Sequence, residues 1–111
     1  MILIPSYHNP FQQFVKKQHK PVKAAIEDAV EEVLANPAAG EFKRGDLQGV
    51  QVVKFKFQRI EYLIAYQVPV IGPGAGAATR EIEFITIEFY KVNLHENFYE
   101  ELKRYLKSIK G

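Results

Sequence analysis

The chain has 111 residues, of which 47% are hydrophobic and 25% are charged, and it contains no cysteine. This length suits one domain with its own core and is too short for two. The lack of cysteine excludes disulfides, thiol nucleophiles and thiolate metal sites. No apolar run approaches the roughly 20 residues that cross a bilayer, and no basic leader typical of a signal peptide opens the sequence. We therefore expect a single cytoplasmic domain over residues 1–111, without membrane association.

The charges are unevenly distributed, although the net charge is only +2. Most basic side chains fall within residues 16–23 and 43–59, and acidic side chains gather at residues 27–32 and 81–88. Such segregation can give one face a positive potential that attracts phosphate backbones. An ordinary solvated surface gives the same pattern, so the charges alone do not choose between the two.

The N-terminal residues predict a short strand and then a helix. An apolar run at residues 2–4 ends at a proline, as expected for a small strand. Asn9 followed by proline is typical of a helix start, and Gln12 would complete a capping box. The helix should end near His19, because a proline two positions later disfavours helical backbone before it.

A second helix is predicted from Pro21. Its apolar residues recur at spacings of three and four as far as Leu34, and Asn36 followed by proline ends it. Two helices joined by so short a connection form an antiparallel hairpin.

Three strands are predicted after a turn-rich segment at residues 36–49. Residues 52–57 alternate between apolar and polar side chains, which gives a strand with one apolar and one basic face. A short connection leads to a second strand at residues 60–68. Residues 81–92 form a third, which is apolar enough on both sides to lie centrally in a sheet.

A glycine- and alanine-rich segment at residues 72–78 separates the last two strands, and we expect a flexible loop there. Gly72, Gly74 and Ala77 formally fit the phosphate-binding pattern G-x-G-x-x-A. That pattern requires a helix to begin at the loop, whereas the following residues predict a strand. Nucleotide binding is therefore disfavoured.

The C-terminal residues predict a helix capped by Asn93, with Glu96 at its third position. The letters H-E that begin at His95 suggest a zinc protease, but H-E-x-x-H needs a second histidine where Tyr99 stands. We therefore expect no metal site. His95 would lie in the first helical turn at the rim of the sheet, where it either bonds to the helix end or transfers protons.

Other polar side chains are predicted to lie on the sheet. Lys54 and Lys56 project from the same face of one strand, where they can hold a phosphate or simply face water. Tyr62 and Tyr66 share the more apolar side of the next strand, which favours core positions.

The order of these elements resembles that of the RelE/ParE toxin superfamily. The run "IEDAVEEVLANPAAGEFKRGDLQGVQVVKFKFQRIEYLIAYQV" is similar to the middle of that family, and "LHENFYEELKRYLK" is similar to the ending of many of its members. The resemblance spans residues 10–107, except for the apparent insertion at residues 72–78. It implies an α+β fold with an N-terminal strand and helix hairpin packed on a mainly antiparallel sheet of about four strands, with a C-terminal helix.

The resemblance also implies a function. Members are toxins of bacterial type II toxin–antitoxin systems, each inhibited by a cognate antitoxin protein. RelE-like members cut messenger RNA on the ribosome without a cofactor, and ParE-like members inhibit DNA gyrase instead. We expect the endoribonuclease activity, with gyrase inhibition or a non-toxic protein-binding module as the alternatives.

The catalytic residues implied by the resemblance are His95, Tyr99, Lys54 and Glu61. His95 and Tyr99 resemble the C-terminal His-x-x-x-aromatic element of the cleaving branch, which makes His95 the candidate acid. Lys54 corresponds to the basic strand that faces RNA, and Glu61 lies roughly where that branch has an acidic residue.

The RNA-binding residues implied in the same way are Lys43, Arg44, Lys56 and Arg59. Two positions depart from the cleaving branch. Leu63 stands where many members have an arginine, and Phe57 stands where the histidine-rich branch has another histidine.

Overall fold

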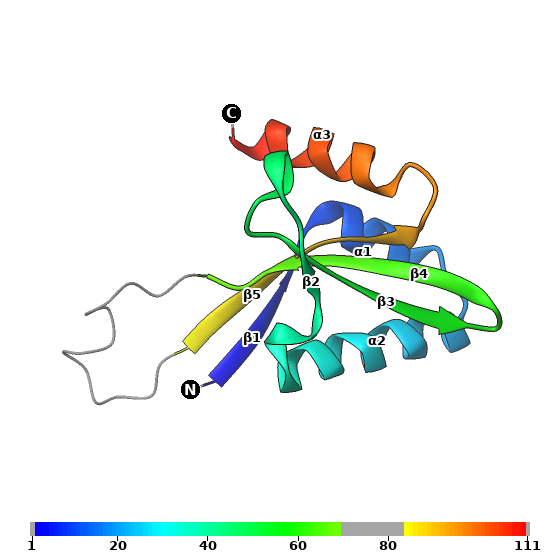
Figure 1. Cartoon of the computed structure of the whole chain (residues 1–111). Helices are drawn as coiled ribbons and strands as arrows, with labels where there is room; N and C mark the ends of the chain where they lie inside the picture. Colours follow the sequence, from blue (N-terminus) through cyan, green and yellow to red (C-terminus); the bar gives the residue numbers. More distant parts are fainter. Residues whose placement is uncertain (1, 70–83, 111) are drawn as a thin grey trace.

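The structure is a computed structural model that describes residues 2–69 and 84–110 (Figure 1). The glycine- and alanine-rich segment at 72–78, including the G-x-G-x-x-A pattern, lies outside the described residues. The predicted α+β fold is confirmed: a strand, a helix hairpin, a mainly antiparallel sheet and a C-terminal helix follow one another along the chain.

Within the described residues, a mixed sheet of five strands forms the centre of the fold. The strands are β1 (Ile2–Tyr7), β2 (Glu41–Phe42), β3 (Gln51–Phe57), β4 (Ile60–Gln67) and β5 (Phe84–Leu94). They lie in the order β1-β5-β4-β3-β2, with β1 parallel to β5 and every other pair antiparallel. The fifth strand, β2, lies within the segment that we predicted as turn-rich, because a two-residue strand has no detectable alternation.

Helices cover both faces of the sheet. The helices are α1 (Asn9–Lys16), α2 (Lys20–Ala35) and α3 (Phe98–Lys110), with short 3-10 turns η1 (Pro37–Ala39) and η2 (Gly45–Leu47). Figure 1 shows α2 and α3 on opposite sides of the sheet. Two separate cores result.

The helix hairpin closes the larger core. Its buried members are Phe11, Ile26, Ala29, Val30, Val33, Ile64, Tyr66, Ile87, Phe89 and Val92. Those on α2 recur at the three- and four-residue spacing seen in the sequence, which confirms the predicted apolar stripe. The alternate residues of β4 and β5 supply the facing half.

The C-terminal helix closes the second core on the other face. Its members are Leu47, Val50, Val52, Leu63, Ala65, Tyr90, Phe98, Leu102 and Leu106. Phe98 and Leu102 are fully buried, and burial of side chains of this size stabilises the fold by roughly 1.5–3 kcal/mol each. This core holds α3 against the sheet.

A β-bulge redirects side chains in the middle of β5. Ala65 pairs with Lys91 but Tyr66 pairs with Phe89, so Tyr90 is an extra residue. Phe89 and Val92 consequently both face the hairpin with two residues between them. The bulge turns Tyr90 and Lys91 toward α3, which alternation along the sequence does not predict.

The helix boundaries correct two predicted caps. His8, rather than Asn9, is the N-cap residue of α1, and the Gln12 amide donates to the Tyr7 carbonyl oxygen at 2.8 Å. Asn93 lies within β5, and α3 begins five residues after it. In contrast, the end of α2 at Asn36 is confirmed.

The buried Tyr66 hydroxyl fastens the chain after α2 to the sheet. It donates to the Pro37 carbonyl oxygen at 2.8 Å and accepts from the Gly40 amide at 2.8 Å. The Gln51 side chain bonds to the same group of atoms. Gly40 is required there, because a Cβ would lie 2.6 Å from the Tyr66 hydroxyl oxygen. The predicted core position of Tyr66 is confirmed.

Candidate functional site

The connection from β5 to α3 carries His95. Residues 95–97 form a turn, and the Phe98 amide donates to the His95 carbonyl oxygen at 3.2 Å. Asn97 has a φ of 59°, a left-handed conformation that asparagine tolerates better than most residues. The Asn93 side chain accepts a hydrogen bond from the next amide instead of capping α3. His95 is therefore an exposed turn residue, not a member of the first helical turn.

The turn brings His95 beside Tyr99. Their ring centroids are 6.1 Å apart, and the rings are inclined at 80°. Residues 95–100 line a shallow hollow of about 250 Å³. Histidine and tyrosine together at an open hollow can exchange protons with a bound molecule.

Lys43 reaches Tyr99 from the edge of the sheet and is paired with Glu41. Lys43 Nζ lies 3.2 Å from Glu41 Oε1 and 5.2 Å from the centroid of the Tyr99 ring. The Lys43 side chain is only 21% exposed. Burial lowers the pKa of Lys43, but its contacts with Glu41 and Tyr99 outweigh burial and raise the pKa above its ordinary value. The ammonium group is thus engaged with two neighbours.

Lys54 and Lys56 lie on the α3 side of the sheet. They lie two and four residues after Val52 and so share the face of that side chain, which belongs to the α3 core. Both lysines are exposed, and within residues 2–69 and 84–110 neither has an ion-pair partner within 4.0 Å. Two free ammonium groups on one strand face can neutralise phosphate.

Glu61 and His95 are placed near each other by the pairing of β4 with β5. Each is adjacent to the last residue pair of β4 and β5, which is Tyr62 with Leu94. Glu61 is also the cross-strand partner of Lys56. This corner of the sheet therefore has Lys56 on β3, Glu61 on β4 and His95 just after the end of β5, and neighbouring strands lie about 4.8 Å apart.

The corner is a shared face rather than a common cavity. Neither Lys54 nor Lys56 borders the hollow at His95. Lys56 instead borders a separate hollow of about 490 Å³ between β3 and α2. The structure brings Tyr99 together with His95 and Lys43, and it keeps the β3 lysines farther along the sheet.

Arg44 and Arg59 mark the two ends of β3. Arg44 is exposed just before η2, and Arg59 is exposed in the β3–β4 turn with a φ of 68°. The seven residues of β3 lie between them, so the two arginines are roughly 20 Å apart. They cannot share one phosphate group, but they can contact successive phosphates of an extended strand.

The two departures from the cleaving branch are explained by their surroundings. Leu63 is fully buried beneath α3 in the second core. An arginine there would lose its hydration and disrupt the packing of Phe98 and Leu102. Phe57 borders the hollow on the α2 side, so a histidine at this position would face away from His95.

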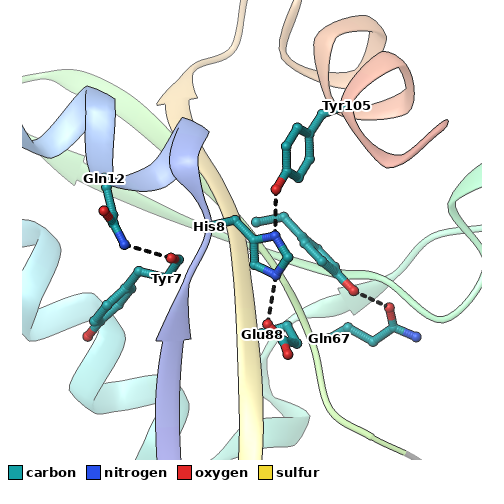
Figure 2. A network of polar contacts seen from close by, with 7 residues as sticks. Tyr7, His8, Gln12, Gln67, Glu88 and Tyr105 are labelled. Atoms are coloured by element: carbon teal, nitrogen blue, oxygen red, sulfur yellow. Dashed lines mark hydrogen bonds and ion pairs between the residues drawn. The ribbon is translucent and has the colours of Figure 1, made fainter. Parts of the chain in front are cut away.

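A second polar cluster joins the other end of α3 to the sheet (Figure 2). His8 Nδ1 lies 2.6 Å from the Tyr105 hydroxyl, and His8 Nε2 lies 2.7 Å from Glu88 Oε2. A carboxylate only accepts, so Nε2 donates to Glu88 and, in the neutral ring, Nδ1 accepts from Tyr105. Tyr90 packs edge-on against His8 and donates to Gln67 Oε1 at 2.8 Å.

Sequence reasoning missed this cluster. Its members are separated by 80 and 97 residues, so no spacing pattern connects them. Burial raises the pKa of Tyr105, and the nearby Glu88 carboxylate raises it further. The phenol consequently stays protonated and remains a donor to His8. The side chains of His8 and Glu88 are 21% and 39% exposed.

Two surfaces suit a protein partner. β1 pairs only with β5 and leaves its other edge free among the described strands, with Ile2 and Ile4 partly exposed beside it. A hollow of about 300 Å³ opens between α1 and α2 and is bordered by Phe11, Val15 and Ile26. The edge of β1 can pair with a strand of the partner, and the hollow between α1 and α2 can hold an apolar helix.

The described residues contain neither a cluster of metal ligands nor a membrane-spanning helix. Across residues 2–69 and 84–110, no group of three histidine or acidic side chains could hold a metal ion. Of the helices in that part of the chain, none is long and apolar enough to cross a membrane.

A known protein family matches most of the chain. A family model described as the ParE-like toxin of the type II bacterial toxin–antitoxin system matches residues 6–103. No curated protein and no solved structure matches the chain.

Proposed function

The chain belongs to the ParE-like toxin family of type II toxin–antitoxin systems, and on this basis we propose that it arrests growth by cutting messenger RNA on the ribosome. Family membership implies a cognate antitoxin as its protein partner. Either of the two partner surfaces, the free edge of β1 or the hollow between α1 and α2, suits that antitoxin.

The proposal is carried by the corner where Glu61 and His95 flank the last β4–β5 pair and Lys56 lies across from Glu61. Cleavage of RNA by its own 2′-hydroxyl needs a base, an acid and positive charge, and it needs no metal ion. These three kinds of group occur together at this corner. Tyr99 adds a hydroxyl beside His95.

In the proposed reaction, Glu61 takes the proton of the 2′-hydroxyl as its oxygen attacks the neighbouring phosphorus. Lys54 and Lys56 stabilise the added negative charge on the phosphoryl oxygens. His95 gives a proton to the 5′-oxygen as the bond from that oxygen to phosphorus breaks. The products are a 2′,3′-cyclic phosphate and a 5′-hydroxyl. Arg44 and Arg59 bind the RNA backbone on either side of the cleaved bond.

Mapping of the cleaved ends tests this chemistry. The purified protein would be added to a reconstituted translation reaction with an end-labelled messenger RNA. We expect fragments ending in cyclic phosphate and 5′-hydroxyl, and we expect a single 2′-deoxynucleotide at the cleavage position to abolish the cut. A 5′-phosphate product, or cleavage next to the deoxynucleotide, would exclude attack by the 2′-hydroxyl.

Inhibition of DNA gyrase is the second candidate function. The observation that favours it is the fully buried Leu63, which leaves the chain without the arginine found in many cleaving members. A supercoiling assay with purified gyrase separates the two functions. Loss of supercoiling with intact transcripts would support gyrase inhibition and contradict the nuclease proposal.

A further inference from the structure

The environment of Lys43 differs from that of the other candidate RNA-binding residues. Arg44, Lys56 and Arg59 are exposed, whereas the Lys43 side chain is only 21% exposed. Its backbone amide donates to the Val50 carbonyl oxygen at 2.9 Å, which extends the pairing of β2 with β3. The residue is therefore held in an extended conformation with its side chain on the α3 face.

The contacts of Lys43 fix the direction of its ammonium group. Glu41 lies two residues earlier on the same face, opposite Val52, and its carboxylate oxygen is 3.2 Å from Lys43 Nζ. On the other side the ammonium group meets Tyr99, 5.2 Å from the ring centroid. Glu41 itself is 77% exposed, so this carboxylate orients Lys43 from the solvent side.

Lysine chemistry then determines the role of the Tyr99 hydroxyl. The Lys43 ammonium group lies over the Tyr99 ring, and because an ammonium group has donors and no acceptor, it cannot accept the phenol hydrogen. The phenol hydrogen then points away from Lys43. His95 stands at the ring edge, 6.1 Å between centroids, and the hollow formed by residues 95–100 opens beside both rings.

We propose that Lys43 and Glu41 are positioning residues, with Glu41 orienting the Lys43 ammonium group and Lys43 holding Tyr99 so that its hydroxyl donates to a phosphodiester oxygen of RNA. This inference rests on the proposed nuclease function. It assigns Lys43 to Tyr99 rather than to the RNA backbone, and it adds Glu41, which sequence reasoning did not single out.

A double-mutant cycle tests the assignment in the messenger RNA cleavage assay. We expect Lys43→Met and Tyr99→Phe each to lower kcat about tenfold with little change in KM, since Tyr99→Phe removes the hydroxyl that donates to the RNA and Lys43→Met removes the group that positions it. The double variant should be no slower than Tyr99→Phe alone, because Lys43 acts through the hydroxyl. Lys43→Arg should restore most of kcat, and Glu41→Gln should cost less than Lys43→Met.

Arg44→Met is the matched control, because Arg44 is the adjacent exposed cation. As a backbone contact it should raise KM, reduce the salt dependence of binding and remain additive with Tyr99→Phe. If Lys43→Met behaves like this control, Lys43 is an RNA contact and the inference is wrong.

A spectroscopic measurement separates this inference from the nuclease proposal. In protein labelled with ¹³C at the hydroxyl-bearing carbon of tyrosine, Tyr99→Phe identifies the Tyr99 signal. Lys43→Met should shift that signal and Arg44→Met should not. An unshifted signal would overturn the inference even if RNA is cleaved, and absence of RNA cleavage by the natural sequence would overturn the nuclease proposal while leaving the Lys43–Tyr99 contact measurable.

Discussion

Each end of α3 has a histidine beside a tyrosine, but the two histidines differ in their hydrogen bonds. At the C-terminal half, His8 bonds through both ring nitrogens, to Tyr105 and to Glu88. At the N-terminal end, His95 has only a ring contact with Tyr99 and, among the described side chains, no hydrogen-bond partner. A histidine with both nitrogens engaged stabilises a fold, whereas a histidine with open nitrogens can exchange a proton with a ligand.

The difference between the ends comes from the elements that meet there. Near Tyr105, three elements converge, since His8 is the N-cap residue of α1 and Glu88 lies on β5. Near His95, β5 has just ended and the chain turns through solvent. Where three elements pack together, the polar groups of His8 find hydrogen-bond partners. Where β5 ends at a turn, the ring nitrogens of His95 face solvent.

Substitution of the two histidines gives the largest contrast. We expect His95→Ala to lower messenger RNA cleavage by more than about 100-fold, as for loss of a general acid, with little change in melting temperature because the side chain is exposed. His8→Ala should leave cleavage unchanged and lower the melting temperature. Cleavage rates at saturating substrate and thermal unfolding of both variants make the comparison, and equal loss of cleavage in both would break it.

Substitution of Lys54 and Lys56 on β3 tests whether this face of the sheet binds RNA. Lys54→Ala with Lys56→Ala should weaken RNA binding about tenfold at low salt and reduce the salt slope by about 1.4, as expected for the loss of two phosphate contacts to a single strand. The matched control is Lys16→Ala with Lys17→Ala, which removes two exposed charges near the end of α1. Salt-dependent binding of a single-stranded RNA measures both, and an equal loss in the control would show that only net charge matters.

The cluster at Tyr105 should appear in stability. Tyr105→Phe is expected to lower the free energy of unfolding by about 1 kcal/mol, the usual net value of a hydrogen bond in a partly exposed site. His8→Ala should lower it by more, because that change also removes the bond to Glu88. Their effects should not add, because the two side chains bond to each other. Denaturant unfolding of the single and double variants measures the coupling, and additive losses would mean that the bond stabilises nothing.

Alkaline pH should give the smallest effect. The folded pKa values of Tyr90 and Tyr105 are both raised, chiefly by burial, from an ordinary value of 10.0. The unfolded chain therefore loses these protons first, so stability is full below about pH 10 and falls as pH rises through the folded pKa values. Unfolding at pH 9 and pH 11 measures the drop, which Tyr105→Phe should reduce. An unchanged slope in that variant would assign the drop to other groups.

Much of the architecture was predictable because it rests on local patterns. The apolar stripe of α2 and the alternation of β3 follow from the spacing of apolar residues. The residues that this spacing selects are buried in the cores on the two faces of the sheet. The predicted cap at Asn93 is wrong, because Asn93 pairs with Leu63 of β4 and β5 continues through it. The pairing gives the backbone of this segment hydrogen-bond partners in the sheet. Local signals of that kind lose to long-range hydrogen bonding.

The candidate site was predictable only in part. His95, Lys54 and Lys56 were singled out from the sequence pattern and from resemblance. Strand register then placed the two lysines on one face with Glu61, and His95 follows the end of β5. The contact of Lys43 with Tyr99 joins residues 56 positions apart in the chain, which no local period reports. The bulge at Tyr90 likewise turns Lys91 toward Glu101 and defeats simple alternation.

The sequence by itself determined the family, the helix hairpin, the three long strands and the residue types available for chemistry, because these depend on composition and on periods of two and 3.6 residues. Only the tertiary structure decided which polar groups have partners. A hydrogen bond or ion pair requires two side chains within about 3 Å, and that separation depends on how the sheet and α3 pack.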